Sequence, residues 1–190
     1  MKLSSVNAFA LSVVTATALP RFNLLAREDP NYVPVTIVDA PNRNVTCGNV
    51  VYTEQDIYHA VAWGTILQDA DQTRGSKLHP SKTLSLASPE LTDAAFPHPF
   101  THGEVFGLPD KCGEVGDPNL QEYPVQQGRM YNGTALNDTE NFDRVVYLHT
   151  KGETDSLFNH PQAMFCGVAT KTWAPGKGLV LCTWEGCCDS

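Results

Sequence analysis

Six cysteines are the feature that most constrains how this chain of 190 residues can fold. None of them belongs to a Cys-x-x-Cys pair with the histidine spacing of a zinc site. In an oxidising compartment such cysteines form disulfide bonds, which tie distant parts of a chain together. If the chain is exported, we therefore expect a domain stapled by disulfides, with no metal and no other cofactor.

The N-terminus has the pattern of a secretory signal peptide. Lys2 precedes a mostly apolar run at 8–14, and small residues follow at 16–18. No stretch approaches the roughly twenty apolar residues that a membrane-spanning helix needs. We therefore expect cleavage near Ala18 and a secreted, extracellular protein that does not enter a membrane. Three glycosylation sequons agree with export, at Asn44, Asn132 and Asn137.

The charge of the chain restricts its partners. With 13 basic and 21 acidic residues, its formal net charge is −8. Sequence-independent binding of long nucleic acid depends on lysine and arginine side chains that replace the counterions of phosphates. We therefore expect no DNA binding, and any RNA site must be confined to a small part of the surface.

Two segments precede the predicted domain. Residues 1–18 are predicted to be the signal peptide. Residues 19–40 contain three prolines and no sustained hydrophobic period, which predicts a pro-segment or flexible arm, although a strand could begin at Val35. Residues 41–190 suffice for one hydrophobic core, so we predict a single domain there.

The apolar pattern of this domain predicts an α+β fold. A capping box of Thr53 with Asp56 and the helical spacing after it predict one amphipathic helix over 53–69. Residues 71–95 follow neither period and are predicted to form a long surface loop. Segments rich in β-formers predict strands at 122–125, 143–149, 165–171 and 179–182. We expect the helix to pack on one face of an antiparallel sheet, leaving the other face for a ligand.

Five segments form a combined pattern when taken in order along the chain. They are Val45-Thr-Cys-Gly-Asn-Val-Val-Tyr52, Phe96-Pro-His98, Glu122-Tyr-Pro-Val125, Asp143-Arg-Val-Val-Tyr147 and Gly167-Val-Ala-Thr-Lys-Thr172. This pattern resembles the fungal guanyl-specific ribonucleases over roughly residues 45–183. The resemblance implies the microbial ribonuclease fold and metal-free cleavage of single-stranded RNA through a 2′,3′-cyclic phosphate.

The resemblance also implies two disulfide bonds. The family joins the cysteine of its Thr-Cys-Gly segment to one on the last strand, and Cys47 and Cys182 occupy these places. Some members join a cysteine before the glutamate strand to one on the strand of the second catalytic histidine, here Cys112 and Cys166. The cysteines at 187–188 have no counterpart, and the sequence leaves open whether they pair together, pair with another chain or are trimmed.

Three residues match catalytic positions of the family. Glu122 takes the place of the general base that accepts the proton of the ribose 2′-hydroxyl. Strand alternation puts it on the face opposite Tyr123 and Val125. Arg144 matches the arginine that stabilises phosphoryl charge, and His98 matches a histidine that either holds the glutamate or assists as a base. Without the family pattern, the same residues would be an exposed carboxylate, a surface salt bridge and a loop histidine.

The acid histidine of the family is absent. Its place in the frame Gly-Val-x-Thr-His-Thr is taken by Lys171. A lysine acts as an acid near neutrality only if its pKa falls well below its ordinary value of about 10.4. Because a general acid contributes about 10²–10⁴-fold, the resemblance predicts reduced turnover. His149 lies five positions after Arg144 and should face away from it, whereas His102 could stack on a base or reach the cleft.

The segment that binds guanine in the family is altered as well. Phe96 stands where the family usually has a tyrosine whose hydroxyl contacts the phosphate. In the aligned segment Phe100-Thr-His-Gly-Glu104, Phe100 can still stack on a base, which is worth about 1–3 kcal/mol, and Glu104 can still accept hydrogen bonds. We count His102 among these substrate-binding candidates. The segment predicts binding of some base and leaves guanine specificity open.

Two functions stay open on the sequence. One is a secreted endoribonuclease of the guanyl-specific type with impaired activity, which uses Glu122, His98 and Arg144 and has Lys171 as an electrostatic stabiliser. The other is a catalytically inactive effector with the ribonuclease fold, similar to those of plant-pathogenic fungi, which binds RNA, a host ribonucleoprotein or a host protein. The acidic balance and Lys171 disfavour a ribotoxin. In each case we expect a monomer.

Overall fold

The computed structural model describes residues 33–75, 95–102, 107–133, 143–171 and 178–182. Several expectations fall outside these described residues. They are the signal peptide, most of the predicted arm, most of the predicted loop at 71–95, Glu104, the sequon at Asn137 and the cysteines at 187–188. The described residues belong to one unit that begins at Val33.

The predicted helix is confirmed as α1 (Glu54–Asp69). The Thr53 hydroxyl accepts a hydrogen bond from the Asp56 amide, and the Asp56 carboxylate accepts one from the Thr53 amide. This reciprocal cap satisfies two N–H groups that have no partner within the helix. Ile57, Val61 and Leu67 form part of its buried face. No helix within the described ranges is long and apolar enough to cross a membrane.

Six of the strands form one mixed sheet in the order β1-β7-β6-β5-β4, with β8 also paired to β7. Their bounds are β1 (Thr36–Val38), β4 (His98–Pro99), β5 (Leu120–Pro124), β6 (Arg144–Leu148), β7 (Gln162–Thr170) and β8 (Val180–Leu181). The four strands predicted after the helix are thus present, as β5 to β8. The expectation of a purely antiparallel sheet is wrong, because β1 runs parallel to β7. A parallel edge strand on an otherwise antiparallel sheet makes it mixed.

A hairpin and two disulfide bonds complete the framework. The hairpin pairs β2 (Val45–Cys47) with β3 (Val50–Tyr52) just before α1. The bond Cys47–Cys182 ties this hairpin to the residue after β8, and Cys112–Cys166 ties the short helix η2 (Asp110–Cys112) to β7. Both pairings that the resemblance implied are therefore present. Their separations of 135 and 54 residues correspond to about 5 and 4 kcal/mol in the chain-entropy description, each taken alone.

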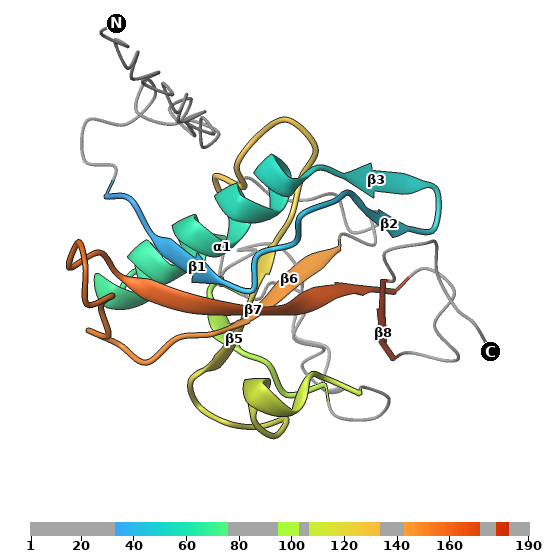
Figure 1. Ribbon diagram of the computed structural model, residues 1–190. Helices are drawn as coiled ribbons and strands as arrows, with labels where there is room; N and C mark the ends of the chain where they lie inside the picture. Colours follow the sequence, from blue (N-terminus) through green and yellow to red (C-terminus); the bar gives the residue numbers. More distant parts are fainter. Residues whose placement is uncertain (1–32, 76–94, 103–106, 134–142, 172–177, 183–190) are drawn as a thin grey trace, which may run out of the picture. The chain divides into compact units, whose positions relative to one another are not determined.

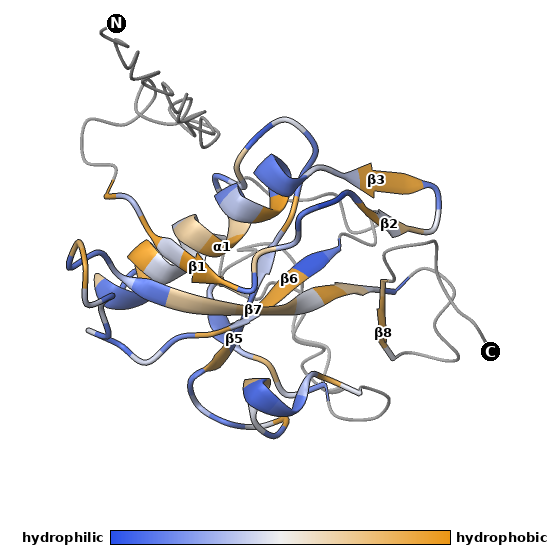
Figure 2. Ribbon diagram, in the orientation of Figure 1, coloured by the Kyte–Doolittle hydropathy of each residue, from blue (hydrophilic) through white to orange (hydrophobic). Residues whose placement is uncertain are grey.

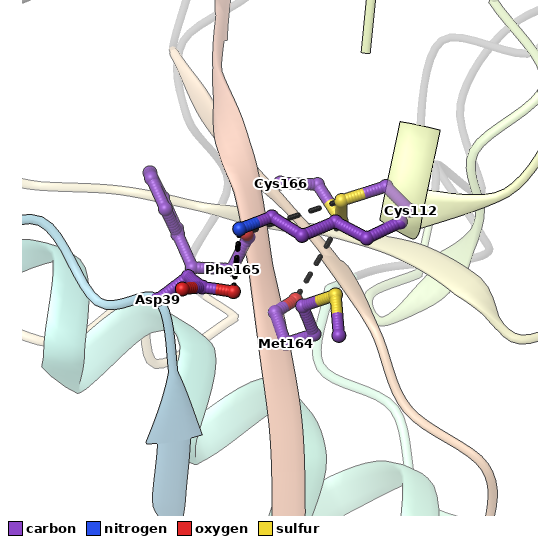
Figure 3. The surroundings of a disulfide bond; sticks show 6 residues. Asp39, Cys112, Met164, Phe165 and Cys166 are labelled. Carbon is purple, nitrogen blue, oxygen red and sulfur yellow. Dashed lines mark hydrogen bonds and ion pairs between the residues drawn. A yellow bond between two sulfur atoms is a disulfide. The ribbon is translucent and has the colours of Figure 1, made fainter. Parts of the chain in front are cut away.

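Figure 3 shows the second disulfide beside the end of β1. Asp39, the residue that follows β1, forms an ion pair with Lys111 of η2. The loop that carries Cys112 is thus held to the sheet by a covalent bond to β7 and by an ion pair near β1.

Both faces of the sheet are packed. Along β6, Val145 and Tyr147 belong to the hydrophobic cluster that includes α1, whereas Val146 belongs to a second cluster with Phe100 and Leu179. Figure 1 shows α1 lying across β1 and β7, and Figure 2 shows that β6 is hydrophobic over most of its length with a hydrophilic end. The second cluster thus covers part of the face opposite the helix. The expectation that this whole face is left for a ligand is therefore wrong.

Candidate active site

Three adjacent strands bring His98, Glu122 and Arg144 together. His98 on β4 and Val146 on β6 are both direct cross-strand partners of Glu122 on β5. Cross-strand partners share a face, and so do residues two apart on one strand. Arg144, two residues before Val146, is therefore a diagonal neighbour of Glu122 on the same face.

The Glu122 carboxylate is the centre of this cluster. It is 0 % exposed. Arg144 Nη1 donates to both of its oxygens, at 3.1 Å each. His98 Nε2 lies 3.1 Å from Oε1, at the distance of an ion pair but without the alignment of a hydrogen bond. A buried carboxylate is costly unless it is paired, and these contacts provide the pairing.

His98 is positioned by the segment around it. Its ring stacks on Phe96, with centroids 4.7 Å apart and an interplanar angle of 26°. Its Nδ1 lies 3.0 Å from the carbonyl oxygen of Pro99. Because a carbonyl only accepts, Nδ1 carries a proton, and Nε2 is the nitrogen turned toward Glu122.

The sequence left open whether His102 stacks on a base or reaches the cleft. In the structure its ring approaches the Glu122 carboxylate. Its Nε2 lies 3.7 Å from Glu122 Oε1 and 3.4 Å from Arg144 Nη1. Burial lowers the pKa of His102 below its ordinary 6.5, and the charges of Arg144, His98 and Lys171 lower it further, against the opposing effect of Glu122.

Lys171 stands at the edge of the cluster. It directly follows β7, where Ala169 is the cross-strand partner of Arg144. Residues two apart share a face, so Lys171 leaves the strand on the Arg144 face. It is exposed, and its charge acts on the pKa of His102. Arg144 and Lys171 bring two basic side chains to the same edge of the sheet in a chain of net charge −8.

The two phenylalanines differ from their expected roles. Phe100 is 0 % exposed within the second hydrophobic cluster, so its ring is not presented to a base. Phe96 is also buried, and it packs against His98 and lies 5.5 Å from the Arg144 guanidinium carbon. Burial of both rings stabilises the fold, because it removes a large apolar surface from water. Sequence analysis missed this supporting role of Phe96, since no local pattern links it to Arg144.

Two buried polar residues lie around β6 without joining the cluster. His149 binds Asp69 at the end of α1 through Nε2, at 2.9 Å, and its Nδ1 donates to the Gln162 carbonyl. It faces away from Arg144, as strand alternation predicts. Asp143 accepts a hydrogen bond from the Tyr52 hydroxyl at 2.9 Å, and burial raises the pKa of this carboxyl. Asp143 thereby anchors the start of the strand that presents Arg144.

Comparison with known proteins assigns the chain to no family. No protein-family model matches the sequence, and no curated protein is similar enough to match it. The fold and the cluster define an α+β domain with two disulfide bonds and a buried carboxylate flanked by an arginine and two histidines.

Proposed function

We propose that this protein is a ribonuclease-like protein that binds single-stranded RNA and cleaves it slowly through a 2′,3′-cyclic phosphate. The observation that carries the proposal is the Glu122 carboxylate, bound by Arg144 and approached by two histidines that reach solvent. Catalytic acids and bases are commonly found in such clusters, where burial and neighbouring charges perturb titration.

In this reaction Glu122 accepts the proton of the ribose 2′-hydroxyl, and the freed oxygen attacks phosphorus. Arg144 stabilises the charge that develops on the phosphoryl oxygens. In the free protein its Nη1 is engaged by both oxygens of Glu122. An incoming phosphate therefore competes with Glu122 for the guanidinium, and it also meets Lys171.

A purely structural ion pair accounts less well for the same groups. Replacing a buried ion pair with apolar residues of similar size is often neutral or stabilising, so stability alone gives little reason to keep one. His98 and His102 add two further titratable groups with 27 % and 44 % of their side-chain surfaces exposed. A proton-transfer site open to solvent explains this combination.

A second candidate is RNA binding without cleavage, by a secreted effector that has kept the fold. One observation favours the absence of cleavage: Lys171 occupies the position at which the resembled family has its acid histidine. Phe100 is buried and leaves no ring at that position to stack on a base, which favours a host protein as an alternative occupant of the same surface.

The test compares RNA cleavage and RNA binding by the mature protein and three variants. We expect 2′,3′-cyclic phosphate ends from the wild type, a loss of about 10²–10⁴-fold in Glu122→Gln, and a gain in Lys171→His. Glu153→Gln is the matched control, because Glu153 is exposed and lies beside Gln162, at the opposite end of β7 from the cluster.

The outcomes separate the candidates. Binding without cleavage, in the wild type and in Lys171→His, supports the effector. Two phosphate-binding cations predict a shallow salt dependence of binding, with a log–log slope of about −1.4 for single strands. A protein that neither binds nor cleaves RNA would contradict both candidates.

A further inference from the structure

The cleavage proposed above needs a group that returns a proton to the departing 5′-oxygen. Glu122 acts as the base and Arg144 carries a permanent charge, so neither can supply that proton. Lys171 is exposed at the edge of the cluster and makes none of the contacts that the described residues bring to Glu122. The two histidines that approach Glu122 are therefore the candidate donors among the described residues.

The contacts of the two histidines differ. His98 has one nitrogen at the Pro99 carbonyl and the other at Glu122, and its ring is stacked on Phe96. His102 meets Glu122 and Arg144 through Nε2, at 3.7 and 3.4 Å, and its ring contacts that of Phe100 edge-on, with centroids 5.9 Å apart. With 44 % of its side chain exposed, against 27 % for His98, His102 is the more accessible of the two to an incoming ligand.

We propose that His102 is the proton donor of this site, and that its imidazolium form binds the phosphate beside Arg144. This inference rests on the proposed function. It assigns the missing acid to the segment that aligns with the base-binding loop, and Lys171 keeps only an electrostatic role.

The proton balance of the step is complete. Glu122 takes the 2′-hydroxyl proton, the 2′-oxygen forms a bond to phosphorus, and the bond between phosphorus and the 5′-oxygen breaks. The proton on His102 Nε2 passes to that 5′-oxygen, which leaves as a hydroxyl. Proton exchange with water then restores both residues.

The groups around His102 determine its response to pH. Burial, with Arg144 on β6, His98 on β4 and Lys171 after β7, lowers the pKa of His102, and Glu122 on β5 opposes them. Its protonated form is therefore scarce at neutral pH in the free protein. A bound phosphodiester adds negative charge, so binding at neutral pH should draw a proton onto His102.

The first experiment varies the leaving group. One substrate is a dinucleoside phosphate, whose 5′-oxygen needs a proton, and the other is a nucleoside 3′-(4-nitrophenyl phosphate), whose phenolate leaves without one. His102→Asn should lose about 10²-fold or more on the first substrate and little on the second. Glu122→Gln and His98→Asn should affect both substrates alike, and His160→Asn, at the other end of β7, should affect neither. Equal loss on both substrates, or no loss, in His102→Asn would overturn the assignment.

The second experiment does not require cleavage. A 2′-deoxy dinucleoside phosphate lacks the attacking hydroxyl, and its phosphodiester does not titrate near neutrality. Calorimetry in two buffers of different ionisation enthalpy then measures the proton uptake on binding. We expect uptake in the wild type and in His98→Asn, and none in His102→Asn. Absence of binding, absence of uptake, or uptake that survives in His102→Asn would overturn the inference. A protein that takes up the proton but does not cleave RNA would contradict the proposed activity alone.

Discussion

Glu122→Gln should destabilise the fold as well as remove the proposed base. The substitution keeps the shape of the side chain but removes its charge, and it leaves Arg144 charged with only 10 % of its side chain exposed. Breaking a buried pair by neutralising one partner typically costs about 3–5 kcal/mol.

Two features of the structure reduce that figure. The glutamine carbonyl can still accept one of the two bonds that Arg144 Nη1 makes at 3.1 Å, so one charge-assisted bond is lost, at about 1.5–3 kcal/mol. The contact of Arg144 with the Phe96 ring, at 5.5 Å, is unchanged. We therefore expect a loss of about 2–3 kcal/mol in the free energy of unfolding, or about 4–12 °C in the melting temperature.

Urea unfolding at neutral pH, followed by circular dichroism, measures this loss. The double variant Glu122→Gln/Arg144→Met removes both charges and should recover most of the stability, because no unpaired charge remains. Glu153→Gln serves as the exposed control. A Glu122→Gln protein as stable as the wild type would show that the guanidinium is well hydrated. A double variant no better than the single one would assign the loss to packing, and either result would refute the reasoning.

Two further predictions concern parts of the fold away from the cluster. Gly64→Ala should lower the free energy of unfolding by about 1–3 kcal/mol in urea titrations, because a Cβ there would lie 2.6 Å from the Tyr147 hydroxyl oxygen in the core. The backbone amide of Phe158 is the foremost of several donors that lower the pKa of Asp155 to about 2. The ionised Asp155 carboxylate therefore stabilises the fold above its ordinary pKa of 3.8, and this contribution is lost as pH falls toward about 2. Asp155→Asn should flatten this acid part of the stability–pH curve.

Companion measurements make both predictions specific. Adding Tyr147→Phe to Gly64→Ala removes the crowded oxygen and should restore part of the stability, and an unaffected single variant would show that the ring moves aside. An acid limb that persists in Asp155→Asn would assign that part of the curve to another carboxyl.

Short-range patterns predicted the local elements well. The capping box of Thr53 with Asp56 located the start of α1, because the cap involves residues only three apart. Short segments rich in β-formers located β5 to β8, because this preference also acts over a few neighbouring residues. Strand alternation also separated Glu122 from Tyr123, which packs in the cluster that includes α1.

The site was predicted only in part. The resemblance supplied Glu122, Arg144 and His98 as candidates, and the strand register of β4, β5 and β6 brings them together. It also predicted an exposed Phe100, yet that ring is buried in the second cluster. Local sequence does not reveal which loop covers the second face of a sheet, because that cover is assembled from segments far apart in the chain.

The sequence by itself determined where the helix and the central strands lie, since hydrophobic period and caps act over a few residues. The resemblance paired the cysteines correctly. Only the tertiary structure decided that β1 joins the sheet in parallel, that Phe96 supports the cluster from the core, and that His102 reaches Glu122. These features depend on contacts between segments far apart in the chain, and such contacts form only when the whole sheet and both hydrophobic clusters pack together.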